Sequence, residues 1–163
     1  ILGMSVFFAL SAAIAPFIGQ NLGQKKWGRI QQAINQSNGF SLLWGGLAAL
    51  VLWLLSAPIA GVFTDSPEVA SIVTIYLSIV PISFGFQGVY LIGSACLNTI
   101  GKPLPAFVIS QPHMFFFYLP LAFLGANIGG TSGAFVGIAL SYFLGALVFF
   151  FYLRRLIERN SRQ

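Results

Sequence analysis

Four polar side chains that could do chemistry stand inside otherwise apolar stretches of this sequence: Gln87, Tyr90, Gln111 and His113. The carbonyl and amide of Gln87 can coordinate an ion or hydrogen-bond a substrate, and they can equally make a purely structural bond between helices. Histidine titrates in the pH range over which a proton gradient operates, so His113 is a candidate for a proton relay or a substrate contact. The alternative is that its imidazole only bonds a carbonyl freed by the neighbouring Pro112.

The rest of the sequence lacks the residue sets of an enzyme or a metal site. Its acidic residues, Asp65, Glu68 and Glu158, lie at the edges of the apolar stretches, and Cys96 is the single cysteine. We find neither a nucleophile with a base at suitable spacing nor a cluster of metal-binding side chains. We therefore expect a non-enzymatic protein without a metal or another cofactor.

The composition indicates an integral membrane protein. Hydrophobic residues make up 57% of the 163 residues, charged residues only 7%, and the mean hydropathy is +0.87. These values are far from those of soluble domains. The net charge of +5 does not indicate nucleic-acid binding, because the basic residues form short clusters at the ends of apolar stretches. The partner that the composition implies is a lipid bilayer.

Apolar stretches and their breaks predict an all-α polytopic protein, a bundle of five transmembrane helices in one domain. We expect Ser66 to cap the third helix, Pro67 to open it and Glu68 to face its positive end. Pro81 and Pro112 are expected to kink their helices, as hinges or as static packing devices. Small residues at every fourth position, such as Gly137, Ser141 and Gly145, favour close helix contact. The expected helices cover about residues 1–18, 29–57, 67–98, 103–124 and 133–157.

The charge distribution predicts the orientation in the membrane. Lysine and arginine occur at the first and third connections and at the C-terminus, whereas the second and fourth connections contain neither. All eight basic residues are thus expected on the cytoplasmic side of a cell (inner) membrane, with the C-terminus inside. The run Phe149 to Tyr152 precedes the C-terminal arginines and is interpreted as a lipid-facing girdle, with a drug-stacking site as the alternative. Because the sequence opens on Ile1 within an apolar helix, we expect it to be the later part of a longer protein.

Several short motifs follow one another in order along the chain. They are Gly19-Gln20-Asn21-Leu22-Gly23, Phe63-Thr64-Asp65-Ser66-Pro67-Glu68-Val69, Gly93-Ser94, Leu97-Asn98, Gly101-Lys102-Pro103, Leu119-Pro120-Leu121-Ala122 and the stretch from Gly130 to Gly133. Taken together, these motifs resemble the multidrug and toxic compound extrusion (MATE) transporters. The resemblance covers essentially the whole chain and places it as the later part of the second lobe of a twelve-helix transporter, the eighth to twelfth helices.

The resemblance implies a secondary active multidrug exporter, which exchanges organic cations for Na⁺ or H⁺ by alternating access between two lobes. Its partners would be the first lobe of the same protein and the cationic substrates. Several family members carry an acidic residue at the position that aligns with Gln87. The coupling carboxylate is therefore expected in the N-terminal part of the protein, outside this sequence.

Two other functions remain open at this stage. A flippase for lipid-linked saccharides would share the superfamily fold, but it would need arginines within its cavity to bind the lipid diphosphate. No lysine or arginine lies in the middle of an apolar stretch. A membrane scaffold subunit that transports nothing is the third reading, and it predicts no ion-dependent flux.

Overall fold

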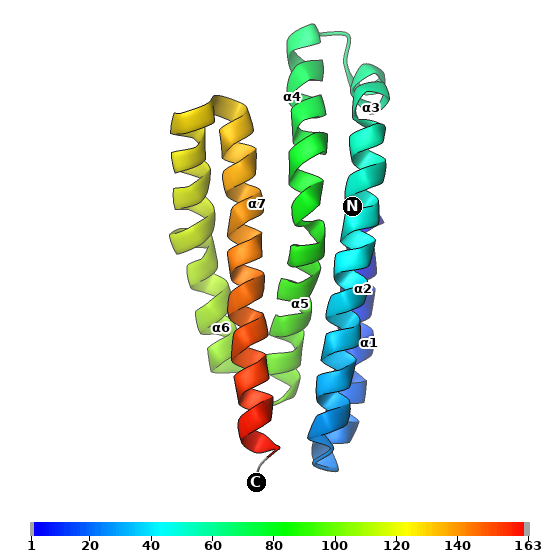
Figure 1. The fold of residues 1–163 in the computed structure, drawn as a ribbon, viewed down its shortest axis with the longest axis vertical. Coiled ribbons are helices and arrows are strands. Elements are labelled where there is room, and N and C mark those ends of the chain that lie inside the picture. Colours follow the sequence, from blue (N-terminus) through cyan, green and yellow to red (C-terminus); the bar gives the residue numbers. More distant parts are fainter. Residues whose placement is uncertain (1, 162–163) are drawn as a thin grey trace.

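The computed structural model describes residues 2–161, and within that range it is built from helices that run side by side (Figure 1). The element η1 is a 3₁₀ turn and η2 is a π-helical turn. In chain order the elements are α1 (Leu2–Gly23), α2 (Trp27–Leu54), α3 (Ser56–Phe63), α4 (Pro67–Ile79), η1 (Val80–Ser83), α5 (Phe84–Thr99), α6 (Pro103–Pro112), η2 (His113–Tyr118) and α7 (Leu119–Asn160).

Four helical segments of the described chain are long and apolar enough to cross a membrane. They are Gly3–Gly23, Trp27–Leu54, Pro67–Thr99 and Pro103–Asn160. The last of these folds back on itself at Gly129 and Gly130, so that its two halves lie antiparallel (Figure 1). The described residues therefore make five passes, which confirms the predicted all-α polytopic bundle.

The first helix is longer than expected. We predicted that it ends at Ile18, but α1 continues to Gly23. The reason is local: Asn21 is buried, its side-chain amide donates to the Phe17 carbonyl at 2.8 Å, and its own carbonyl accepts from the Lys26 N–H. The first bond spans Gly19 within the last turns of α1, and the second closes the C-terminal end of the helix. The reversal into α2 is then completed by Lys25, which adopts a positive φ of 53°. The predicted first residue, Ile1, lies outside the described residues.

The second pass also differs from expectation at its end. We predicted one helix to residue 57 followed by a turn through Ser66, but a second short helix, α3, follows α2 and runs to Phe63. Pro58 lies in the first turn of α3, where a missing N–H breaks no helical bond. The non-helical connection is therefore confined to 64–66. The predicted Ser66 side-chain cap is absent; instead the Ser66 N–H donates to Thr64 Oγ1 at 3.1 Å.

The third pass starts at Pro67 as predicted, with Glu68 in its first turn. It is one continuous helical rod from Pro67 to Thr99, yet its middle tightens to the 3₁₀ turn η1 around Pro81. Proline cannot donate a backbone hydrogen bond, so the regular ladder is interrupted there. The sequence-based expectation of a local irregularity at Pro81 thus has its counterpart in η1.

The last two passes are joined by a shorter turn than expected. We predicted a loop over residues 125–132, but only Gly129 (φ −132°, ψ 19°) and Gly130 (φ 58°, ψ −140°) leave helical geometry. Gly125 and Gly133 lie backbone to backbone, since a Cβ on either would overlap the other's carbonyl group. This contact allows the two helices to pack from the turn onward, and both therefore extend to it.

Helix α5 is the centre of the bundle, packing against α1, α2, α6 and α7. The buried apolar cluster joins the end of α1, the start of α2, the end of α5 and the end of α7. These parts lie at the same end of the molecule as the α1–α2 and α5–α6 connections and the C-terminus (Figure 1). Helices α2 and α5 also approach backbone to backbone, where Gly45 faces the backbone of Gly85.

Candidate functional site

Gln87 is held by its own helix. Its side-chain amide donates to Ser83 Oγ at 2.9 Å, and that hydroxyl donates to the Val80 carbonyl at 2.8 Å. The bond between helices that we considered as the structural alternative is therefore absent from the described residues. Gln87 is half-buried, and its side-chain oxygen accepts no hydrogen bond within the described chain. Ser83, four residues earlier on the same helix face, is a site residue that the sequence reasoning missed.

Tyr90 lies one turn further along α5 and reaches the fourth pass. Its hydroxyl donates to the carbonyl of Ser110 in α6 at 3.1 Å. The ring centroid of Tyr90 is 4.9 Å from that of His113 and 4.9 Å from that of Phe149. Tyr90 thus connects the central helix to both of the last two passes.

His113 is 6% exposed, and its Nε2 lies 2.8 Å from the Ser141 carbonyl oxygen of α7. A carbonyl can only accept, so Nε2 must carry the proton in this bond. The alternative in which the imidazole bonds a carbonyl freed by Pro112 is wrong, because its partner belongs to another pass. His113 therefore ties η2 to α7 at a buried position.

Gly145 makes room for this arrangement. A Cβ on Gly145 would lie 2.7 Å from His113 Cδ2, 2.8 Å from His113 Nε2 and 3.1 Å from Tyr90 Cδ2. Contacts below 3.0 Å are essentially never made by real Cβ atoms. The small-residue stripe of the last helix, which we read only as a packing signal, thus contains a position that forms one wall of the histidine pocket.

Tyr142 completes an aromatic cluster that sequence reasoning missed. Its ring centroid lies 5.5 Å from His113, 6.4 Å from Tyr90 and 6.1 Å from Tyr118. The signal available in the sequence was its place directly after Ser141 in the small-residue stripe, which puts it at the edge of a close helix contact. Three passes therefore contribute aromatic or imidazole rings to one half-buried cluster.

Gln111 lies apart from this cluster. It is exposed at the end of α6, and in the described chain no hydrogen bond joins it to Gln87, Tyr90 or His113. Directly after it, Pro112 precedes the π-helical turn η2, in which the Leu119 N–H donates to the Met114 carbonyl. Proline interrupts the helical hydrogen-bond ladder, and the wider turn that results changes the direction in which the following side chains project. The irregularity at Pro112 thus presents His113 toward α7.

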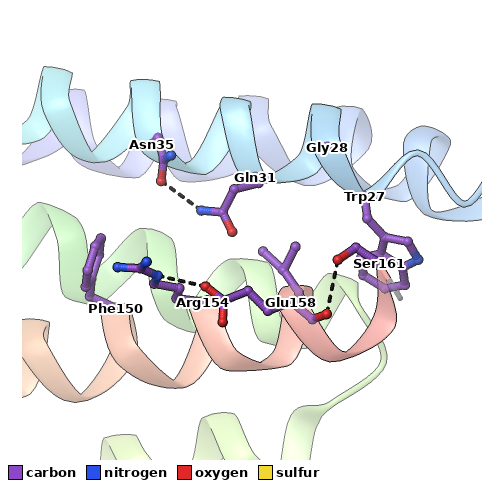
Figure 2. Close-up of a pocket in the computed structure, with 9 residues that line it drawn as sticks. Trp27, Gly28, Gln31, Asn35, Phe150, Arg154, Glu158 and Ser161 are labelled. Carbon is purple, nitrogen blue, oxygen red and sulfur yellow. Dashed lines mark hydrogen bonds and ion pairs between the residues drawn. The ribbon is translucent and has the colours of Figure 1, made fainter. Parts of the chain in front are cut away.

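A polar cavity of about 520 Å³ opens between the start of α2 and the end of α7 (Figure 2). Within it the Gln31 amide donates to Asn35 Oδ1 at 2.8 Å, and Arg154 Nε donates to Glu158 Oε1 at 2.9 Å. Each pair is formed within one helix, with Gln31 and Asn35 on α2 and the ion pair on α7. These two bonds therefore form without any contact across the cavity.

The charged residues separate along the bundle. The described basic residues lie at the α1–α2 connection, the α5–α6 connection and the C-terminal end of α7, which Figure 1 places at one end of the molecule. Asp65 and Glu68 lie at the opposite end, next to the start of α4. Arg162 lies outside the described residues. Among the residues that the structure describes, no group of three His, Cys, Asp or Glu side chains could hold a metal ion.

Several known proteins are similar to this chain in fold and in sequence. The sequence profile of the MatE family matches residues 1–124. The crystal structure of the Vibrio cholerae MATE transporter VcmN in its bent form superposes with a TM-score of 0.93 at 30% identity, covering 98% of this chain and 36% of that one. The FAD transporter of Shewanella oneidensis is 30% identical over 153 residues, which is 94% of this chain and 34% of the relative. Protein DETOXIFICATION 9 of Arabidopsis thaliana is 26% identical over 157 residues, 94% of this chain and 32% of the relative.

The chain spans about a third of the length of these relatives. The family match covers most of its residues, and the likeness to VcmN extends over nearly all of them. Proteins of this family are multi-pass membrane transporters and not enzymes, which agrees with the predictions from composition and motifs. This chain belongs to the MatE family of MATE transporters.

Proposed function

We propose that this chain is part of a secondary active exporter that moves organic cations across the cell (inner) membrane in exchange for Na⁺ or H⁺ by alternating access. The observation that carries the proposal is the likeness to the MATE transporter VcmN over 98% of the chain at 30% identity. The described polar groups support it, because they lie on the central helix α5 and on the two passes that pack beside it. No cofactor beyond the coupling ion is needed.

Within this proposal Gln87 and Ser83 form a contact point for the coupling ion or the substrate. The side-chain oxygen of Gln87 is free to accept within the described chain, while its amide is anchored to Ser83 Oγ. An amide oxygen and a hydroxyl can coordinate Na⁺, but neither can exchange a proton near neutral pH. The coupling carboxylate would belong to the part of the transporter that this chain does not span. The first lobe of the transporter is therefore the proposed partner.

We assign a second role, in substrate contact or proton relay, to Tyr90 and His113. Their rings are adjacent, and both polar groups are bonded to backbone carbonyls of neighbouring passes. The His113 bond also joins η2 to α7, so the pair lies where the last two passes meet. Pro81 and Pro112 mark the irregular turns at which these passes would bend during alternating access.

The proposed orientation has the C-terminus in the cytoplasm. It rests on the gathering of the described basic residues at one end of the bundle and on the positive-inside rule. A reporter enzyme that is active only in the cytoplasm, fused after the last residue of the chain, should be active. If the cytoplasmic reporter is inactive and a reporter that is active only in the periplasm is active, the C-terminus lies outside and the proposed orientation is wrong.

Transport in proteoliposomes tests the proposed function. The full transporter that contains this chain is reconstituted, and efflux of the cationic dye ethidium is followed under a Na⁺ gradient and, separately, under a pH gradient. We expect efflux under one gradient, a strong loss in Gln87→Ala and His113→Ala, and no loss in Gln36→Ala, which changes an exposed amide of α2. Absence of ethidium flux under both gradients would reject the cation exporter.

A second candidate substrate is FAD, because one relative of this chain is an FAD transporter at 30% identity. FAD differs from a cationic dye in its negatively charged diphosphate, so the two substrates make opposite electrostatic demands on a cavity. The same vesicles distinguish the two substrates. FAD uptake that is not inhibited by ethidium would favour FAD transport. The family match and the lack of lysine or arginine in the middle of the described passes speak against the lipid-linked saccharide flippase.

A further inference from the structure

Two adjoining cavities on α7 form a groove with an apolar part and a basic part. The larger, of about 410 Å³, lies between η2 and α7 and is lined by apolar side chains that include Phe117, Leu144 and Val148. It ends at Tyr152 and Arg155. The smaller, of about 200 Å³, shares these two residues and continues to Arg159. One groove therefore runs from a purely apolar wall to two guanidinium groups.

The two arginines of this groove have no acidic partner in the described chain. Glu158, the one acidic residue nearby in sequence, pairs with Arg154 at 2.9 Å. That pair lines the other cavity, toward α2 (Figure 2). Arg155 and Arg159 are four residues apart and thus neighbours on one helix face, where like charges destabilise a helix unless a counterion is present. An external anion bound at this face would offset the repulsion between the two guanidinium groups.

The position of the groove identifies the kind of anion. Val148, Phe151 and Tyr152 are 41%, 53% and 37% exposed, so the apolar wall is open toward the surroundings of the bundle. The arginines follow this wall directly, at the end of a membrane-spanning helix where aromatic and basic side chains meet lipid headgroups. Guanidinium groups bind phosphate through paired hydrogen bonds. An apolar chain below a phosphate, at this depth, is the chemistry of a phospholipid.

We propose that this groove binds an anionic phospholipid, with an acyl chain against Phe117 and Val148 and the phosphate between Arg155 and Arg159. The occupant carries net negative charge because two uncompensated cations face it, and basic pockets between membrane helices are known to select such headgroups. Binding spans η2 and α7, the two elements that the His113 bond also joins. Phe117 connects the two sites, since its ring also stacks on His113 at a centroid distance of 6.0 Å.

Lipid binding to the full transporter tests the proposal without reference to transport. The purified, delipidated protein is titrated with palmitoyl-oleoyl phosphatidylglycerol or with phosphatidylcholine of the same chains, and bound lipid is counted by native mass spectrometry beside thermal unfolding. We expect phosphatidylglycerol to bind more tightly and to raise the unfolding temperature more. Each arginine should contribute about fivefold, so Arg155→Gln with Arg159→Gln should weaken phosphatidylglycerol binding ~30-fold.

Two further variants locate the site. Arg154→Gln removes a neighbouring arginine that is already paired and faces α2, and it should leave phosphatidylglycerol binding within about twofold of wild type. Val148→Trp fills the apolar part and should weaken binding although every charge is kept. Equal binding of both lipids, unchanged binding in the double arginine variant, or equal stabilisation by inorganic phosphate alone would each overturn the proposal. Phosphate alone would indicate an anion site without a lipid.

Discussion

Adding one methyl group at Gly145 should break the contact between the last two passes. In Gly145→Ala the new Cβ would lie 2.7 Å from His113 Cδ2 and 2.8 Å from Nε2. The imidazole cannot move aside easily, because it is 6% exposed and lies against the rings of Tyr90 and Tyr142. We therefore expect His113 to lose its bond to the Ser141 carbonyl.

The magnitude follows from three effects. Overpacking of a filled interior costs ~1–3 kcal/mol, and an interhelical hydrogen bond in a membrane protein contributes about 0.6 kcal/mol. Alanine offsets part of this, since it is favoured over glycine in a helix by about 1 kcal/mol. The expected net loss in the free energy of unfolding is about 0.6–2.6 kcal/mol, measured by equilibrium unfolding of the full transporter in mixed micelles.

Gly46→Ala is the matched control for this experiment. Gly46 also lies within a helix, and a Cβ on it would meet nothing within 4 Å. It should be neutral or stabilising by up to about 1 kcal/mol. Combining Gly145→Ala with His113→Ala should recover stability relative to the sum of the two single changes, because the clash is removed. Equal stability of Gly145→Ala and Gly46→Ala would refute the packing argument.

Three more predictions follow from the same contacts. Tyr90→Phe removes the bond to the Ser110 carbonyl but keeps the ring. It should cost ~0.5–1.5 kcal/mol in mixed-micelle unfolding, and a cost above about 2 kcal/mol would contradict this account. Ser83→Ala removes the hydrogen-bond partner of the Gln87 amide. It should raise the Na⁺ or H⁺ concentration needed for half-maximal efflux several-fold. An unchanged ion dependence would exclude Ser83 and Gln87 from ion coupling. Gly45→Ala pushes α2 from α5 and should destabilise more than Gly46→Ala, because a Cβ there would overlap the Gly85 backbone; similar thermal unfolding of both would show a looser interface.

The passes could be predicted from sequence, whereas several of their ends could not. Long apolar runs must be helical in lipid because every backbone polar group needs a partner. Gly19 looked like a break, yet α1 continues beyond it to Gly23, and the carbonyl of the buried Asn21 accepts the bond from the Lys26 N–H that closes the helix. Pro58 looked like the start of a turn, yet it fits the first turn of α3. Glycine and proline therefore indicate where a helix can end, and the neighbouring bonds determine whether it does.

The sequence indicated which side chains to consider for the candidate site, but not the groups that they contact. Polar side chains within apolar helices stand out, and Gln87, Tyr90 and His113 were identified in this way. Their partners depend on contacts between passes: the His113 bond to Ser141 needs the missing side chain of Gly145 as well as the π-helical turn after Pro112. The spacing of residues along the sequence shows neither feature, because His113 and Ser141 are 28 positions apart.

The two-glycine reversal at Gly129 and Gly130 has a consequence for how the protein is made. The turn is short and carries no charge, so in the orientation proposed above its passage across the hydrocarbon layer during synthesis would cost far less than that of a basic loop. Gly125 and Gly133 are already in contact beside it, as are Gly137 and Leu121. The last two passes can therefore enter the bilayer together as a preassembled helical hairpin, before they meet the rest of the bundle.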